Sequence, residues 1–270
     1  MLIKLDKYMY NYGMFRVTLK KISALTAFFA LSLALAPALI LAENLRSTIV
    51  LNTANATPNS TPNLTGICDR VLTEAFKRIG VSIRIIRLPS ERALINANEG
   101  VDDGDFARIE GINKLYSNLI RVPEDITKFE FVAFTKRLNF RINGWDSLKP
   151  YNVGIVTGWK ILEANLAGAK SVIKVKNSNI LFNLLNTDKV DIIVYDRMQG
   201  NALLNELRYA DIRIMKPPLA VKDMYLYMHK KNKDLVPLLT DAIRGMKKDG
   251  TYGKIAGEAL RVNSIKQDKE

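Results

Sequence analysis

Short β-rich apolar runs alternate with longer segments of helical periodicity from residue 47 to about residue 260. The run at 47–51 is rich in β-branched residues, whereas apolar residues recur three and four positions apart over 67–79 and stop at Gly80. Strands separated by helices in this way predict parallel sheets whose faces are covered by helices. The chain is therefore expected to be an α/β protein.

The alternation falls into two successive series, which predicts two small α/β lobes. We expect strands at 47–51, 81–88, 104–109, 131–135, 153–156, 172–175, 191–195 and 224–228. Helices are expected at 67–79, 89–100, 158–166, 178–185, 199–207, 235–248 and 252–260.

Composition removes several classes of site. Cys68 is the only cysteine, so no disulfide can form within the chain, and we expect it in the core. His229 is the only histidine, which excludes multi-histidine metal sites, and we expect it on the surface. No metal and no cofactor are expected. The net charge is +13, but the basic residues are scattered without interleaved aromatics, which favours a solvated surface over a nucleic-acid interface.

The N-terminal segment has the pattern of a secretory signal peptide. Three basic residues between positions 16 and 21 precede an apolar run at 24–42 that ends in a small residue, Ala42. We expect cleavage after Ala42 and a periplasmic location. The alternative is a permanent membrane anchor, because the run is about long enough to cross a bilayer.

Four ordered motifs carry a resemblance to a known family. They read GVDD at 100–103, SLK followed by VGIVTG at 147–158, DIIVYD at 191–196 and KDGTYGKI at 248–255. The set resembles family 3 of the bacterial extracellular solute-binding proteins, which serve polar amino acid uptake by ABC transporters. The resemblance extends over about 47–260.

The resemblance implies a two-lobed, type II periplasmic binding protein-like fold with a ligand cleft between the lobes. Behind the signal peptide at 1–42, lobe 1 would comprise 43–135 and 224–270, and lobe 2 would comprise 136–223. Two crossing strands, near 134–136 and 223–225, would join the lobes. The expected partners are a small-molecule ligand and a membrane permease, and the protein is expected to be a monomer.

Two departures from the family concern the expected cleft. The usual aromatic-rich stretch after the first strand is replaced by NTAN at 52–55, and the usual T-x-E-R segment is replaced by DGDFARIEG at 103–111. The ligand expectation therefore remains a small polar solute, either an amino acid or another carboxylate.

Arg108 is the first candidate for ligand binding. It follows a lobe 1 strand, and α/β sheets present ligand-binding residues at the carboxyl ends of their strands. Its guanidinium offers a planar fork that matches a carboxylate. The alternative is a surface arginine paired with Glu110 or Asp105.

The turn at Thr157, Gly158 and Trp159 is the second candidate. A strand-to-helix turn has free backbone N–H groups that favour an anion. Trp159 either stacks on the ligand or packs inside lobe 2.

Asp196 is expected to bind a ligand ammonium, as the family uses this position, or to be the N-cap of the helix that follows. Together with Arg108 it predicts a zwitterion site, in which the two side chains face each other across the cleft. Asn52 and Thr53 are further hydrogen-bonding candidates. Arg92 is expected either in the cleft or on the surface.

Two alternative functions share the implied fold. A periplasmic enzyme, such as a dehydratase, needs an acid or base in the cleft, and Glu110 is the one candidate. A sensor module for a membrane receptor needs only lobe closure.

Overall fold

The computed structural model describes residues 48–258, and the predicted signal peptide at 1–42 lies outside them. The strands are β1 (Ile49–Thr53), β2 (Ile83–Arg87), β3 (Gly104–Arg108), β4 (Leu119–Thr135), β5 (Asn152–Val156), β6 (Ser171–Val175), β7 (Ile192–Asp196), β8 (Arg213–Ile214) and β9 (Ala220–His229). The α-helices are α2 (Ile67–Arg78), α3 (Ser90–Glu99), α4 (Lys160–Asn165), α5 (Ser178–Asn186), α6 (Arg197–Leu207) and α7 (Leu235–Lys248). Residues 251–258 are also helical, within the predicted range 252–260 as far as the described residues extend. Within 48–258, no helix combines the length and the apolar character needed to span a membrane.

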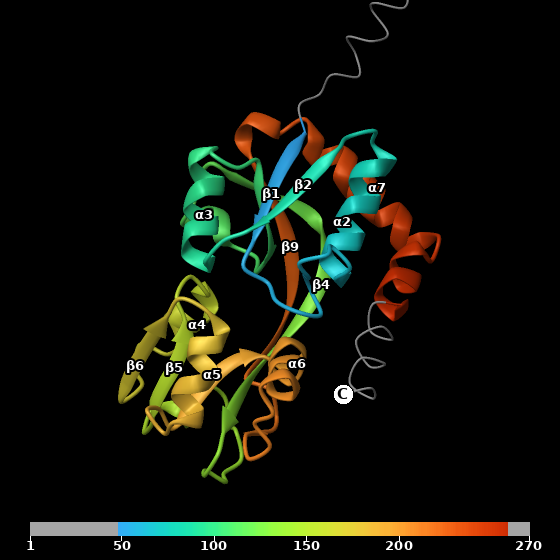
Figure 1. Ribbon diagram of the computed structural model, residues 1–270. Coiled ribbons are helices and arrows are strands. Elements are labelled where there is room, and N and C mark those ends of the chain that lie inside the picture. The colour runs from blue at the N-terminus through green and yellow to red at the C-terminus, as the bar shows by residue number, and fades with distance from the viewer. Residues whose placement is uncertain (1–47, 259–270) are drawn as a thin grey trace, which may run out of the picture. The chain divides into compact units, whose positions relative to one another are not determined.

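Two parallel groups of strands are joined by two long antiparallel strands. The order is β2-β1-β3-β9-β4-β7-β5-β6, and β8 pairs with β4 (Figure 1). Strands β1, β2 and β3 are parallel to one another, as are β5, β6 and β7. The antiparallel pair β4 and β9 runs through both groups. The predicted α/β class is confirmed.

Strand directions make the carboxyl ends of the two parallel groups converge. Strand β3 pairs antiparallel with β9 and runs toward the middle of β9. Its first residue, Gly104, lies opposite Met228, and its last residue, Arg108, lies opposite Tyr225. Strand β7 pairs antiparallel with β4 and also runs inward, so that its last residue, Asp196, lies opposite Phe131. Both groups therefore end at the middle of the β4–β9 ladder, which is where a cleft between the lobes must lie.

Each parallel group has its own helices. Figure 1 shows α2, α3 and α7 around β1–β3, and α4, α5 and α6 around β5–β7. Helix α2 buries an apolar face that includes Val71, Leu72 and Phe76, and it contacts α7. Cys68, on the same face, is wholly buried as expected.

The crossing strands are longer than the sequence predicts. Strand β4 spans 17 residues instead of the predicted 131–135, and β9 spans 10 residues instead of 224–228. Residues Phe131–Phe134 of β4 already pair with β7. The point at which β4 crosses from one parallel group to the other therefore lies before the predicted crossing at 134–136. The lobe limits at 135/136 and 223/224 stay predictions.

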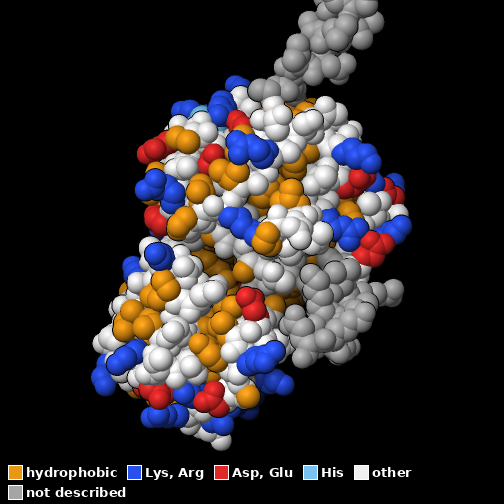
Figure 2. All heavy atoms as spheres, in the orientation of Figure 1, with side chains coloured by type: hydrophobic (Ala, Val, Ile, Leu, Met, Phe, Trp, Pro, Cys, Tyr) orange, Lys and Arg blue, Asp and Glu red, His pale blue; other side chains and the backbone are white. Residues whose placement is uncertain are grey.

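Basic side chains are dispersed over the surface. On the face shown in Figure 2, Lys and Arg occur over both parallel groups, interspersed with Asp and Glu, and do not form one stripe. The solvated basic surface stays a prediction.

Candidate ligand-binding cleft

Two adjoining pockets lie where the parallel strands end. Both are lined by Ala54, Asn55 and Trp159. The first, which we call the narrow pocket, has a volume of about 30 Å³, and the second, the wide pocket, has about 370 Å³. The narrow pocket is lined further by Ala107, Arg108, Ile109, Ile112, Phe129, Phe131, Gly158, Lys160, Ile161 and Met224. The wide pocket is lined further by Arg87, Leu88, Pro89, Val156, Lys176, Asn177, Ser178 and Tyr195.

A β-bulge directs Arg108 toward the narrow pocket. Side chains three apart on a regular strand point to opposite faces, yet Arg108 Nε donates to Asp105 Oδ2 at 2.7 Å. The register shifts between Phe106 and Arg108, and Ala107 has a φ of 58°. The extra residue places the two charged side chains on the same side of the strand.

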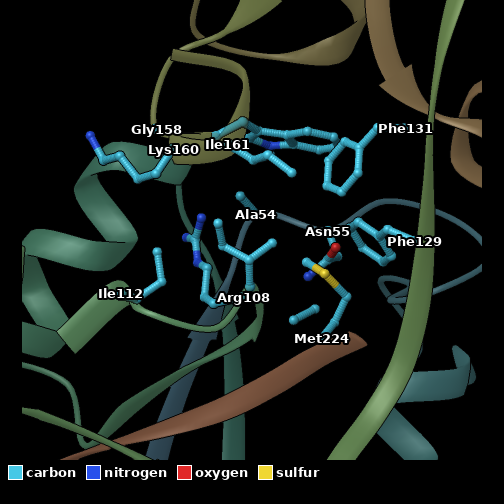
Figure 3. Close-up of a pocket in the computed structure, with 13 residues that line it drawn as sticks. Ala54, Asn55, Arg108, Ile112, Phe129, Phe131, Gly158, Lys160, Ile161 and Met224 are labelled. Atoms are coloured by element: carbon cyan, nitrogen blue, oxygen red, sulfur yellow. The ribbon is translucent and has the colours of Figure 1, made fainter. Parts of the chain in front are cut away.

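Arg108 is 7% exposed, and hydrogen bonds hold its guanidinium firmly. Nη1 donates to Ser90 Oγ at 2.7 Å and Nη2 donates to the Ser90 carbonyl at 3.0 Å. These bonds and the one to Asp105 use three of its five N–H groups, so two remain for a ligand. Figure 3 shows the guanidinium directed into the space between Ile112 and Gly158. Of the two partners that the alternative names, Glu110 pairs with Arg121 instead, whereas Asp105 does pair with Arg108, but the pair is buried and not on the surface.

Asp105 is the buried counter-ion of Arg108. Burial raises the pKa of Asp105 to about 6, although Arg108 lowers it. The pair therefore carries a balanced charge near neutral pH, and Arg108 brings little excess positive charge to the pocket.

Trp159 forms the wall shared by the two pockets. Its ring stacks on Tyr195, with centroids 4.6 Å apart and planes at 19°, and meets Phe131 edge-on at 5.8 Å. The indole is thus packed in an aromatic cluster of lobe 2, as one alternative predicts, and it also lines the cleft. Stacking on a ligand stays a prediction.

The backbone amides of the turn at 157–159 are already bonded. Thr157 donates to the Val175 carbonyl at 2.9 Å, and Trp159 donates to the Val156 carbonyl at 3.4 Å. Gly158 donates to Glu163 Oε1 at 2.9 Å. The prediction of free amides for an anion is therefore wrong, because strand pairing and a nearby carboxylate satisfy them. Thr157 lines neither pocket, whereas Gly158 lines the narrow one.

Asp196 is an N-cap and does not face Arg108. Its Oδ1 accepts from the Gln199 amide at 3.0 Å and its Oδ2 from the Glu130 amide at 3.2 Å. It is 1% exposed, lines neither pocket, and burial raises its pKa to about 6. The predicted zwitterion arrangement is wrong, because the cap of α6 uses one oxygen of this carboxylate and the Glu130 amide on β4 uses the other.

Three weaker candidates also lie outside the two pockets. Asn52 is wholly buried and its Nδ2 donates to Ala93 O and Asp102 Oδ2. Thr53 is wholly buried, and its hydroxyl accepts from the Asn55 amide. Arg92 is exposed on α3, which confirms the surface alternative.

Sequence reasoning missed several lining residues that a simple rule could have found. Arg87 ends a parallel strand and Lys176 follows another, so both stand at carboxyl ends. Phe129 and Phe131 alternate along β4, which puts them on one face. The sequence pattern predicts a strand only at 131–135, and this range leaves out Phe129.

A charged contact links the lobes beside the narrow pocket. Lys160 Nζ, at the start of α4, donates to Glu91 Oε2 on α3 at 2.6 Å and to Glu163 Oε2 at 3.0 Å. Tyr116 donates to the other Glu91 oxygen at 2.7 Å. Burial lowers the pKa of Lys160, but the hydrogen bonds to both glutamates outweigh it and raise the pKa above its usual value.

The other two titratable candidates, Glu110 and His229, line neither the narrow nor the wide pocket. Glu110 lines a third cavity of about 1730 Å³, which shares Ile109, Ile112, Lys160 and Ile161 with the narrow pocket. The Glu110 side chain is 71% exposed and pairs with Arg121. His229 is buried and not on the surface as expected; its Nδ1 accepts from the Lys231 amide at 3.2 Å and its ring lies against Gly100. The described part of the chain holds no cluster of three or more His, Cys, Asp or Glu suited to a metal.

Known proteins provide relatives in sequence and in fold. No protein-family model matches the chain. An uncharacterized protein of Shewanella oneidensis is 26% identical over 203 residues, which is 70% of this chain and 74% of the relative.

Two solved structures share the fold at low identity. The substrate-binding protein of an amino acid ABC transporter has a TM-score of 0.67 and 18% identity, covering 80% of this chain and 100% of that chain. A histidine kinase sensor domain with similarity to periplasmic binding proteins has a TM-score of 0.69 and 15% identity, covering 79% and 96%. The chain therefore has the two-lobed α/β fold of the periplasmic binding proteins.

Proposed function

We propose that the chain is an exported solute-binding protein. It captures a small polar solute, an amino acid or another carboxylate, and passes it to the permease of an ABC transporter. The observation that carries this proposal is the convergence of the two parallel groups. Residues at the strand ends of both lobes, such as Arg87, Arg108 and Lys176, line the same pair of adjoining pockets. In open α/β sheets, ligands bind outside the carboxyl ends of the strands.

Lobe closure is the mechanism that this geometry supports. The narrow pocket, at about 30 Å³, holds no more than one or two waters, so a solute that contacts Arg108 must enter while the lobes are apart. Closure then brings Gly158 and Trp159 of lobe 2 over the solute and desolvates it. The matching substrate-binding protein of an amino acid transporter supports the same reading.

A sensor role is the second candidate, favoured by the similarity to the histidine kinase sensor domain. It uses the same closure but passes the signal to a receptor. A role as an enzyme has less support. Within the described chain, neither the narrow nor the wide pocket is lined by an Asp or Glu. Glu110 and Asp223 line the third cavity, where the Glu110 side chain is largely exposed and paired with Arg121.

Thermal-shift screening of the protein lacking residues 1–42 tests the proposal. The screen covers amino acids, other carboxylates and sugars. A bound ligand at a hundredfold excess over its dissociation constant stabilises the fold by about 2.7 kcal/mol. Trp159→Ala should abolish the ligand-induced shift, whereas Tyr209→Ala, which lines none of the three cavities, should retain it. The proposal fails if no compound of any class raises the melting temperature.

A further inference from the structure

The charged side chains that line the two pockets are all cationic. They are Arg108 and Lys160 in the narrow pocket and Arg87 and Lys176 in the wide one. A cleft that receives a zwitterion needs a carboxylate or several carbonyl oxygens for the ammonium. The expected carboxylate, Asp196, is committed to capping α6.

The cations of the two pockets differ in whether a carboxylate pairs with them directly. Arg108 is paired with Asp105 at 2.7 Å, and Lys160 is paired with Glu91 and Glu163. Arg87 donates to the Ser60 hydroxyl at 3.2 Å, and neither Arg87 nor Lys176 forms an ion pair within residues 48–258. Asp69, which accepts from the same Ser60 hydroxyl, still acts on Arg87 through space. The cations without a direct carboxylate partner therefore lie in the wide pocket.

These two cations come from opposite lobes. Arg87 is the last residue of β2 in lobe 1, and Lys176 directly follows β6 in lobe 2. Lobe contact places both at the rim of one cavity of about 370 Å³, a size within the range of small-molecule sites. Both residues are exposed, so solvent screens part of their mutual repulsion, and an anion between them would relieve the remainder.

The remaining wall of the wide pocket is largely apolar and aromatic. Trp159 and Tyr195, which are stacked on each other, form one side, and Leu88 and Pro89 form another. The polar contribution comes from Asn55, Asn177 and Ser178, and the Asn177 side chain already accepts from the Ile180 amide. This lining suits an apolar body carried by an acidic group.

We propose that the cleft selects an organic carboxylate that has an apolar or aromatic body and no ammonium group. The carboxylate binds between Arg87 and Lys176, and the body lies against Trp159 in the wide pocket. This inference rests on the proposed function and narrows its ligand from any small polar solute to one chemical class.

Matched ligand pairs test the absence of an ammonium site. 3-Phenylpropanoate and phenylalanine differ only in the ammonium group, as do 4-methylpentanoate and leucine. We expect calorimetry to show at least one deaminated acid binding about tenfold or more tightly than its amino acid, because the ammonium finds two cations and no carboxylate. Equal or tighter binding of both amino acids would overturn the inference.

Charge-removing variants test where the carboxylate binds. Arg87→Gln and Lys176→Gln should each weaken the deaminated acid about tenfold and reduce the salt dependence of its affinity. Arg84→Gln, exposed on the same strand β2, and Lys189→Gln, exposed in lobe 2, are matched controls and should leave the affinity unchanged. Full affinity in both pocket variants would overturn the site.

The broad thermal-shift screen separates this inference from the proposed function. If a sugar or an amine stabilises the protein while neither deaminated acid binds, the cleft still captures a solute but the proposed ligand class is wrong. If no compound binds at all, the proposed function fails and the narrower inference fails with it.

Discussion

The pair formed by Arg108 and Asp105 shows how one bulge residue, Ala107, decides the chemistry of a strand end. Without the bulge, the arginine would lie on the opposite face of β3 from Asp105. Because the pair is buried, removing one partner leaves an unpaired buried charge, and this should cost more stability than replacing both partners.

We expect Arg108→Met to lower the free energy of unfolding by about 3–5 kcal/mol at pH 7, because Asp105 is left buried without its counter-ion. The loss should be smaller at pH 5, since the pKa of Asp105, already about 6, rises further without Arg108 and the carboxyl becomes protonated. The double variant Asp105→Asn/Arg108→Met should recover most of the stability. Urea unfolding at both pH values measures this, and equal losses in the single and double variants would contradict it.

Asp196 carries a second pH-dependent contribution. Burial raises its folded-state pKa from 3.8 to about 6, so the protonated form is the one that the fold favours. Its contribution to stability is therefore complete below pH 3.8 and is lost as the pH rises through about 6. Asp196→Asn should keep the helix cap, since Asn and Asp are comparable N-caps, and flatten the stability profile between pH 4 and 6. An unchanged slope in urea unfolding would refute this assignment.

For single residues, the sequence predicts a place at a pocket best when the residue follows a parallel strand. Strand-end position alone placed Arg108, Gly158 and Trp159 at a pocket, because parallel strands end at a common edge. The same rule failed for Asp196, because the sequence does not show which way a capping side chain turns. The bulge at Ala107 leaves no signal in the residue types either.

At the scale of elements, helices were easier to predict than the crossing strands. The helix expected at 235–248 is observed as α7 with those bounds, because its apolar residues recur at helical spacing. Strand β4 was recognised only over its last residues, since Pro123, Glu124 and Asp125 interrupt the apolar pattern. Those residues lie where β4 pairs irregularly with β9, so a partner strand far away in sequence sustains the element.

The turn between β5 and α4 limits how closely the two lobes can approach each other. Gly158 has a φ of 88°, and a Cβ there would lie 2.5 Å from the Glu91 amide nitrogen. Gly158→Ala should therefore cost about 1–2 kcal/mol of backbone strain and also hold the lobes apart. Gly250→Ala is a matched control, with a φ of 82° and open space around its Cβ.

Both glycine variants should lose similar stability to urea, but only Gly158→Ala should weaken ligand binding and enlarge the radius of gyration in small-angle X-ray scattering. Equal affinities in the two variants would mean that the turn does not take part in closure.

At the scale of the whole molecule, polar contacts join the lobes. One is the hydrogen bond from the Ala56 amide to Gln199 Oε1 at 2.8 Å. Another is the ion pair between Lys160 and Glu91, which Tyr116 supports from lobe 1. The side chains of Lys160 and Glu91 are 16% and 34% exposed, so solvent screens the pair only in part. The contact favours the closed arrangement before a solute arrives.

Glu91→Gln should shift the unliganded protein toward an open arrangement. Loss of a partly exposed ion pair is worth about 1 kcal/mol, which changes the ratio of open to closed molecules about fivefold. We expect a larger radius of gyration without ligand, a normal value with saturating ligand, and a correspondingly weaker affinity. Glu74→Gln, which breaks the pair with Arg78 inside lobe 1, should change neither quantity. If Glu91→Gln leaves the unliganded scattering profile unchanged at low ionic strength, where ion pairs are strongest, the pair does not hold the lobes together.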